Sequence, residues 1–304
     1  MSAAAAAVAE ATSLNMKKKV LLALLEKLDF HPGKGLGQNF LIDANLLDFI
    51  IKSAKPAKGE LLLEAGPGFG VLTRGLLEKG AEVTAIEFDH RICEYLRENM
   101  VHPRFTLVEG DACRVNLEEL VDGRDFRAVA NLPYSISSIF IARLLELPNP
   151  PLSMCFMLQK EMAMRMAADK TISNYGALSV RAQIVYDVEI IRNVPPQVFH
   201  PAPEVESAVV YFKRKDEFPD VETRKKVFRM VKLAFSQKRK QMAKPLSACY
   251  PKEKIIESFR KLGYREDLRP HQLDPLQYVT LYRELAQYQI SNAGLDIADD
   301  AAAE

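Results

Sequence analysis

Residues 61–73, LLLEAGPGFGVLT, carry the strongest indication of the fold class. An apolar run ends in three alternating glycines, Gly66, Gly68 and Gly70, and a helical pattern follows them. Glycines at a strand-to-helix turn let the backbone turn sharply and approach a ligand closely. The spacing differs from the G-x-G-x-x-G fingerprint of dinucleotide-binding folds. Taken alone, the motif also fits an ordinary tight turn.

Strand and helix patterns alternate on either side of this loop. Such alternation predicts a Rossmann-like α/β fold, in which helices cover both faces of a mostly parallel sheet. The Gly-rich residues 31–43 predict a loop. The expected strands cover 61–66, 82–87, 105–112, 127–134, 153–159, 188–194 and 207–214, and the expected helices 17–28, 44–54, 71–79, 89–99, 137–146 and 160–168.

A charged segment, RKDEFPD (214–220), predicts a domain boundary. Helical patterns follow it and predict a second, smaller all-helical C-terminal domain over 214–290, beside a larger domain over 17–213. Residues 211–290 carry 19 Lys and Arg against 10 Asp and Glu. That basic balance suggests a polyanion as the partner. The Ala-rich residues 1–16 and the acidic residues 291–304 are expected to be disordered tails.

Several classes of protein are disfavoured by composition. No apolar run approaches the ~20 residues of a membrane span, and the first residues lack the basic and apolar regions of a secretory signal. We therefore expect a cytoplasmic protein without membrane contact. The four cysteines are far apart and have no CxxC spacing or nearby histidine. This pattern predicts reduced thiols, with neither a disulfide framework nor a metal site.

Two acids sharpen the interpretation of the glycine loop. Glu87 ends the second expected strand, where a carboxylate can accept hydrogen bonds from both hydroxyls of a ribose. Asp111 ends the third, where it can accept from the amino group of an adenine. Together they indicate one adenosine-containing ligand. Because the loop contains no basic residue for a pyrophosphate, S-adenosylmethionine is favoured over NAD or ATP as the cofactor.

The fourth expected strand ends in NLPY (131–134). An ordinary Asn-Pro turn is one interpretation. The motif also resembles the signature of S-adenosylmethionine-dependent methyltransferases that modify planar amino groups. In that chemistry the Asn131 side-chain oxygen and the Leu132 carbonyl accept the two N–H groups of an adenine N6, which makes the nitrogen more nucleophilic. Pro133 holds this carbonyl in place, and the ring of Tyr134 stacks on the base, worth ~1–3 kcal/mol.

Further stretches resemble one branch of these enzymes. KGLGQNFLID (34–43), MLQKEMAMRM (157–166), NYGALSV (174–180), VFHPAPEVESAVV (198–210) and AFSQKRKQMAKPL (234–246) occur in the order found in ribosomal RNA adenine dimethyltransferases, most closely the bacterial small-subunit branch associated with kasugamycin sensitivity. Three departures are Ala65 where Ile is usual, Ser135 where Asn is commoner, and QKRK in place of a more arginine-rich run.

The resemblance implies dimethylation of N6 on two adjacent adenines in the 3′-terminal hairpin loop of small-subunit rRNA. The partner would be an immature 30S subunit, and the free enzyme would be monomeric. Phe199 would close the target pocket opposite Tyr134, unless it is an ordinary core residue. The implied cofactor contacts are Asn39, Leu41, Gly66, Gly68, Glu87, Asp111, Ala112 and Asn131, and the basic residues expected to contact RNA phosphates are Lys232, Lys238, Arg239, Lys240 and Lys244.

Four other functions stay open at this point. The related erythromycin-resistance type acts on large-subunit rRNA, and a non-catalytic nucleic-acid-binding factor could use the same fold. A DNA or protein-glutamine methyltransferase shares similar Asn-Pro-Pro-Tyr chemistry, although Leu132 and the basic domain fit RNA better. A dehydrogenase is disfavoured by the glycine spacing.

Overall fold

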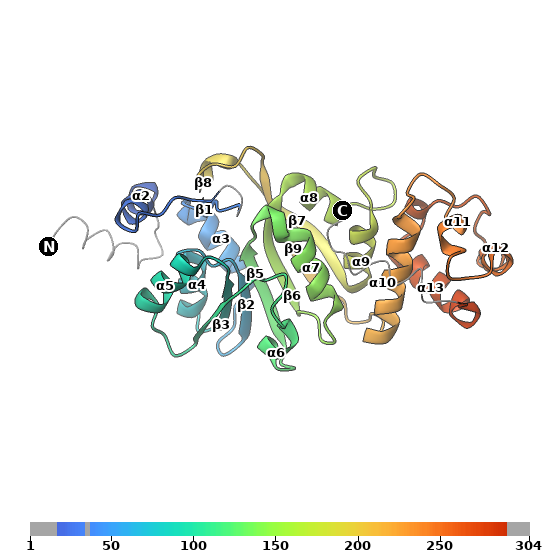
Figure 1. The fold of residues 1–304 in the computed structure, drawn as a ribbon, viewed down its shortest axis with the longest axis horizontal. Coiled ribbons are helices and arrows are strands. Elements are labelled where there is room, and N and C mark those ends of the chain that lie inside the picture. Colours follow the sequence, from blue (N-terminus) through green and yellow to red (C-terminus); the bar gives the residue numbers. More distant parts are fainter. Residues whose placement is uncertain (1–16, 34–36, 291–304) are drawn as a thin grey trace. The chain divides into compact units, whose positions relative to one another are not determined.

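Five consecutive buried residues, Leu61–Ala65, form β2 in the seven-stranded sheet of the computed structural model, which describes residues 17–33 and 37–290 (Figure 1). The parallel strands follow the order β4 (Phe105–Glu109), β3 (Glu82–Glu87), β2, β5 (Phe126–Asn131) and β6 (Ser153–Gln159). An antiparallel strand, β9 (Ser207–Arg214), pairs with β6, and β7 (Tyr186–Val194) forms the edge next to it. The predicted Rossmann-like fold is confirmed.

The strand order reverses between β2 and β5. From β2 the chain proceeds outward through β3 and β4, and from β5 it proceeds in the other direction to β6. Loops that leave the carboxyl ends of β2 and β5 therefore diverge, which leaves a crevice at this edge of the sheet. The glycine loop after β2 and the NLPY motif at the end of β5 lie on its two sides.

Two strands end earlier than the sequence predicts. β4 ends at Glu109 and not at residue 112, because the Asp111 side chain accepts a hydrogen bond from Cys113 N (2.8 Å) and closes a turn. β5 ends at Asn131 because Pro133 has no N–H for the ladder, and a 3₁₀ helix over Tyr134–Ile136 follows.

Three helices of this part of the chain, α3 (Ala44–Ala54), α5 (His90–Asn99) and α6 (Leu117–Val121), begin at a side-chain cap. Asp43 accepts from Leu46 N at 2.7 Å at the start of α3, and Asp89 caps α5. Gly70, with φ +78°, precedes α4 (Val71–Glu78). The remaining helices are α2 (Lys18–Lys27) and α7 (Ser137–Glu146).

Residues 31–43 are not only a loop. Phe40–Leu41 form the short strand β1, which pairs antiparallel with β8 (Phe199–His200), so that Leu41 lies opposite Phe199. Ile42 N donates to Val198 O at 2.9 Å and extends this ribbon. The N-terminal loop is thus attached to a segment far along the chain. Residues 34–36, at the start of the KGLGQNFLID stretch, lie outside the described residues.

The described residues divide into two compact units. One contains the chain up to residue 163 together with 189–214, and the other contains 164–188 together with the chain from 215 onward. The sequence grouped 164–188 with the larger domain. In the structure α9 (Ala177–Val185), which follows α8 (Lys160–Ala167), packs against α10 (Val221–Phe235) and α13 (Pro275–Leu285). Both predicted tails, 1–16 and 291–304, lie outside the described residues.

The helical unit continues through α11 (Ala243–Leu246) and α12 (Lys252–Lys261). α10 ends at Phe235, so Lys238, Arg239 and Lys240 lie in a turn. The sequence pattern had suggested a helix at these three residues. Over 17–33 and 37–290, no helix combines the length and apolar character needed to cross a bilayer. In the same ranges no group of three or more His, Cys, Asp or Glu side chains could hold a metal ion.

Candidate active site

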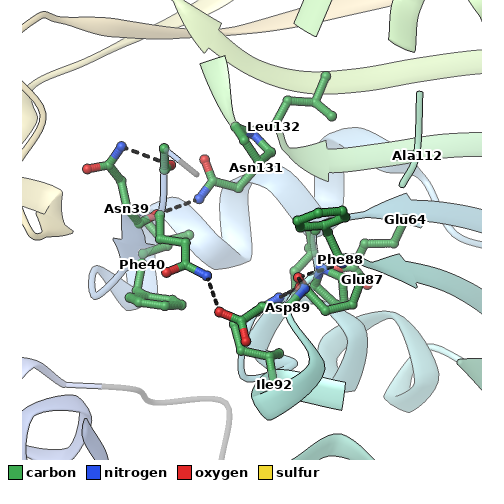
Figure 2. Close-up of a pocket in the computed structure, with 18 of the residues that line it drawn as sticks. Asn39, Phe40, Glu64, Glu87, Phe88, Asp89, Ile92, Ala112, Asn131 and Leu132 are labelled. Atoms are coloured by element: carbon green, nitrogen blue, oxygen red, sulfur yellow. Dashed lines mark hydrogen bonds between the residues drawn. The ribbon is translucent and has the colours of Figure 1, made fainter. Parts of the chain in front are cut away.

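A cavity of about 330 Å³ opens at the carboxyl ends of β2, β3, β4 and β5 (Figure 2). This volume lies within the range of small-molecule sites, and its place at the reversal of strand order is where open α/β sheets bind ligands. All but one of the residues predicted to contact cofactor or target base line it: Asn39, Leu41, Gly66, Gly68, Glu87, Asp111, Ala112, Asn131, Leu132, Pro133 and Tyr134.

Phe199 is the exception. Its side chain is only 3% exposed and belongs to the hydrophobic core cluster, and it is absent from the cavity lining. The β1–β8 pairing places it in the core opposite Leu41. The cavity geometry therefore gives no support to a role for Phe199 at the target base.

The glycine loop brings the backbone close to the NLPY motif. Gly66 has φ +68°, and a Cβ atom added there would lie 3.4 Å from Pro133 Cδ. Gly68 N donates to Glu87 Oε2 at 3.3 Å, which ties the loop to the neighbouring strand. A larger residue at position 66 would be strained by this φ, and its Cβ would lie in direct contact with Pro133.

Glu87 is held by backbone donors from two sides. Its Oε1 accepts from Phe88 N (2.8 Å) and Asp89 N (2.9 Å), in addition to the contact from Gly68. Burial raises the pKa of Glu87 above its ordinary value, and the three backbone N–H groups oppose that rise. The carboxylate is therefore fixed in one orientation at the cavity wall.

Asn131 donates from its side-chain Nδ2 to the backbone carbonyl of Asn39 at 2.9 Å (Figure 2). A carbonyl oxygen can only accept, so this bond requires the NH₂ end of the amide to face Asn39. The side-chain oxygen Oδ1 stays available as an acceptor at the cavity. The Tyr134 hydroxyl lies 2.5 Å from Ser207 Oγ, and burial raises the pKa of Tyr134.

Among the lining residues that had no assigned role from sequence are Glu64, Gln38, Phe88 and Asp89. Glu64 is 1% exposed and accepts a 2.7 Å hydrogen bond from Thr73 Oγ1, and burial raises its pKa to about 8. A single acid inside the apolar run LLLEA was the signal for it. Gln38 Nε2 donates to Asp89 Oδ2 at 3.0 Å.

The charge of the cavity wall restricts the ligand. Four acids line the cavity, Glu64, Glu87, Asp89 and Asp111, and its described lining contains no Lys, Arg or His. This set of side chains fits a cationic ligand such as a sulfonium with an amino-acid ammonium group. A pyrophosphate would meet the carboxylates of Glu87, Asp89 and Asp111, with no cationic side chain in the described lining to balance them, and would be repelled.

The basic residues predicted to bind RNA lie in the helical unit. Lys238, Arg239, Lys240 and Lys244 are exposed, whereas Lys232, in the last turn of α10, is partly buried. Lys238 Nζ donates to Ser173 O at 3.0 Å. Elsewhere in this unit, exposed cations form ion pairs, such as Lys261 with Glu284 at 2.8 Å. Segment 236–244 contains no acid, and that gives it an excess of positive charge.

The sequence profile of the family described as "Ribosomal RNA adenine dimethylase" matches residues 31–287. The chain belongs to this family. It is accordingly a methyltransferase of the ribosomal RNA adenine dimethylase type and uses S-adenosylmethionine, as the sequence predicted. The acidic cavity described above agrees with that cofactor.

Curated relatives of this dimethylase match over nearly their whole length. A "Ribosomal RNA small subunit methyltransferase A" from Chlamydia abortus is 38% identical over 268 residues, which cover 86% of this chain and 95% of the relative. A protein of the same name from Alkaliphilus metalliredigens is 36% identical over 277 residues, 88% of this chain and 96% of the relative.

Two solved structures share the dimethylase fold. A dimethyladenosine transferase from Plasmodium falciparum gives a TM-score of 0.70 at 25% identity and covers 83% of this chain and 100% of its own. The 23S rRNA methyltransferase ErmE gives 0.62 at 27% identity, over 82% of this chain and 100% of its own.

Proposed function

We propose that the chain dimethylates N6 of two adjacent adenines in the 3′-terminal hairpin loop of small-subunit rRNA, during ribosome biogenesis. The curated relatives, named for the small ribosomal subunit, support the choice of subunit. An immature 30S subunit as the direct partner, a monomeric free enzyme and a cytoplasmic location stay predictions from sequence.

The orientation of Asn131 carries the proposal. Asn131 Nδ2 donates to the Asn39 carbonyl at 2.9 Å, so Oδ1 is the end of the amide that can accept a hydrogen bond from an N–H group of a substrate. An adenine N6 has two such donors. Oδ1 of Asn131 and the carbonyl of Leu132 would accept one each, so that the nitrogen lone pair turns toward the cofactor side of the cavity.

The cofactor supplies, when bound, an electrophilic methyl group on a sulfonium. Asp111 and Ala112 would hold its adenine, and Glu87 its ribose hydroxyls. The buried Glu64 and the backbone at Gly66 would lie beside its amino-acid part. These contacts position the reacting groups, and positioning with matched electrostatics is what an in-line methyl transfer requires of a protein.

Tyr134 would supply the stacking surface for the target base. Its ring position is set at one end by Pro133 in the chain and at the other by the contact with Ser207. An adenine can reach this site only after it leaves its own stack, and that costs least in a single-stranded loop. The exposed cations of segment 236–244 would contact phosphates of the same RNA.

Methyl transfer from labelled S-adenosylmethionine to 30S subunits that lack the modification tests the proposal. We expect N6,N6-dimethyladenine in the 3′-terminal hairpin with the wild-type chain and none with Asn131→Ala. Transfer to 50S subunits or naked 23S rRNA, and not to 30S, would instead support the activity named for ErmE. Bound cofactor without transfer to any ribosomal RNA would contradict the proposal.

A further inference from the structure

Arg143, in the last turn of α7, donates hydrogen bonds to the turn that follows β4. Its Nη1 donates to Ala112 O at 2.7 Å, and its Nη2 donates to Val115 O at 2.6 Å. Both carbonyls belong to the turn after β4 that carries Asp111. Among the described residues no carboxylate pairs with Arg143, so its guanidinium is committed to these two backbone acceptors.

The turn that Arg143 holds is closed by Asp111 itself. Asp111 O accepts from Arg114 N (2.8 Å) and Val115 N (2.9 Å), and its side-chain Oδ1 accepts from Cys113 N. Within this turn the carbonyls of Ala112 and Val115 point outward to Arg143. Without the guanidinium, two partly buried acceptors lose charge-assisted hydrogen bonds, and the turn loses its connection to α7.

The same helix begins at the target motif. Ser137 Oγ donates to Pro133 O at 3.1 Å at the start of α7, and Arg143 lies six residues on, at a rise of about 9 Å. One rigid element thus joins the NLPY motif to the turn that carries Asp111.

We propose that Arg143 is a positioning residue for the adenine end of the cofactor, because it fixes the turn from which Asp111 recognises the 6-amino group. The inference rests on the proposed contact between Asp111 and adenine. Nothing in the sequence motif pointed to Arg143, because its partners are backbone carbonyls in the turn after β4.

The affinities of two ligands test this role without any methyl transfer. S-adenosylhomocysteine carries the 6-amino group, and its 6-deamino purine counterpart lacks only that group. Calorimetry gives the ratio of the two dissociation constants. We expect the wild type to prefer the amino ligand by ~tenfold, the effect of one hydrogen bond to a charged acceptor.

Arg143→Met keeps the apolar stem and removes both donors. We expect its affinity for S-adenosylhomocysteine to fall ~tenfold and its affinity for the deamino ligand to change by less than about twofold, so that the preference disappears. Arg143→Lys, which can keep one bond, should give an intermediate ratio. Thermal unfolding verifies that each variant is folded. If Arg143→Met does not fold, the ratio measured for Arg143→Lys decides the test.

Arg104→Met is the matched control. Arg104 also donates to two backbone carbonyls, Ala81 O at 3.2 Å and Leu77 O at 3.0 Å, none of them at the cavity. It should lose stability without changing the ratio. The proposal is overturned if the ratio of the two dissociation constants is unchanged in the Arg143 variants, whether the two affinities stay the same or fall equally. A wild type without any preference overturns it differently, because the Asp111 contact itself then fails.

Discussion

The hydroxyl groups of Tyr134 and Ser207 lie 2.5 Å apart, across the boundary between the NLPY motif and β9. Ser207 is fully buried and pairs with Gln159 at the end of β6, so its position is set by the sheet. The sheet thereby fixes the ring on which the target base is proposed to stack.

Tyr134→Ala should lower kcat/KM for RNA by ~10- to 100-fold, because stacking on an aromatic ring contributes about 1–3 kcal/mol. Tyr134→Phe and Ser207→Ala each remove only one side of the hydroxyl contact and should give equal, smaller losses. Steady-state methylation assays on the double variant check the pairing: its loss should match that of either single variant. Additive losses would show that the two hydroxyls act separately.

Asn131→Ala should reduce kcat by at least ~100-fold at saturating cofactor, because the acceptor for the adenine amino group and its fixed orientation are lost together. Asn39→Ala is the control. It keeps the backbone carbonyl that orients Asn131, so its effect should appear in cofactor affinity and not in kcat. Single-turnover methylation beside calorimetry separates the two. A large kcat loss in Asn39→Ala would contradict the backbone assignment.

Gly66→Ala should destabilise the fold by about 1–2 kcal/mol, since φ is +68° there. It should also weaken cofactor binding, because the strained backbone shifts the loop that lines the cavity. Gly123, with φ +66° and no atom within 4 Å of an added Cβ, gives a control with the same backbone cost and no cavity contact. Urea unfolding and cofactor titration on both variants test this. Equal cofactor affinity in the two would remove Gly66 from the site.

The stability of the chain should decrease as pH rises from about 4.5 to about 8. Burial raises the pKa of Glu64 from 4.5 to about 8, so the folded state keeps a proton that the unfolded state has released over this range. Each unit of that shift corresponds to ~1.4 kcal/mol, which puts the total on the order of a few kcal/mol. Glu64→Gln should flatten the pH profile of urea unfolding, whereas Glu78→Gln, at an exposed site on α4, should not. A profile that Glu64→Gln leaves unchanged would mean that this carboxyl is not the source.

Charge reversal at Lys238 and Lys240 should weaken binding of 30S subunits and lower the slope of log K against log salt by about 1–2. Cofactor affinity should not change, because neither residue lines the cavity. The same reversal at Lys225 and Lys226, exposed on α10 in the same unit, alters net charge equally and is the control. Filter binding at several salt concentrations measures both. Equal losses in the two pairs would indicate a nonspecific charge effect.

Sequence patterns predicted where the strands lie and which motifs follow them, because local rules determine these features, although β4 and β5 each end three residues earlier than predicted. The glycines after β2 and the proline after β5 place their own motifs at the sheet edge. Glu87 ends β3 as predicted, whereas Asp111 lies in the turn two residues after the end of β4. The helix α9 was not predicted, since eight of its nine residues are buried and it has no amphipathic pattern. A run of good helix formers continues through Lys238–Lys240, yet α10 ends at Phe235, with Ser236 as its C-cap residue.

Contacts distant in sequence were beyond such patterns. Phe199 carried a motif but no information about its partner, and its pairing with Leu41 placed it in the core. The bonds from Arg143 to two carbonyls and from Asn131 to a third likewise join different elements. Glu64 was visible as an unusual acid, but its burial depends on the whole sheet around it.

The β1–β8 ribbon has a consequence for synthesis of the protein. Leu41 lies in the wall of the cofactor cavity, and its strand partner, Phe199, is translated after nearly the whole sheet. A nascent chain that already contains the glycine loop, Glu87, Asp111 and Asn131 still lacks the strand that anchors its N-terminal wall. The enzyme therefore acquires a complete cofactor site only when translation has passed residue 200.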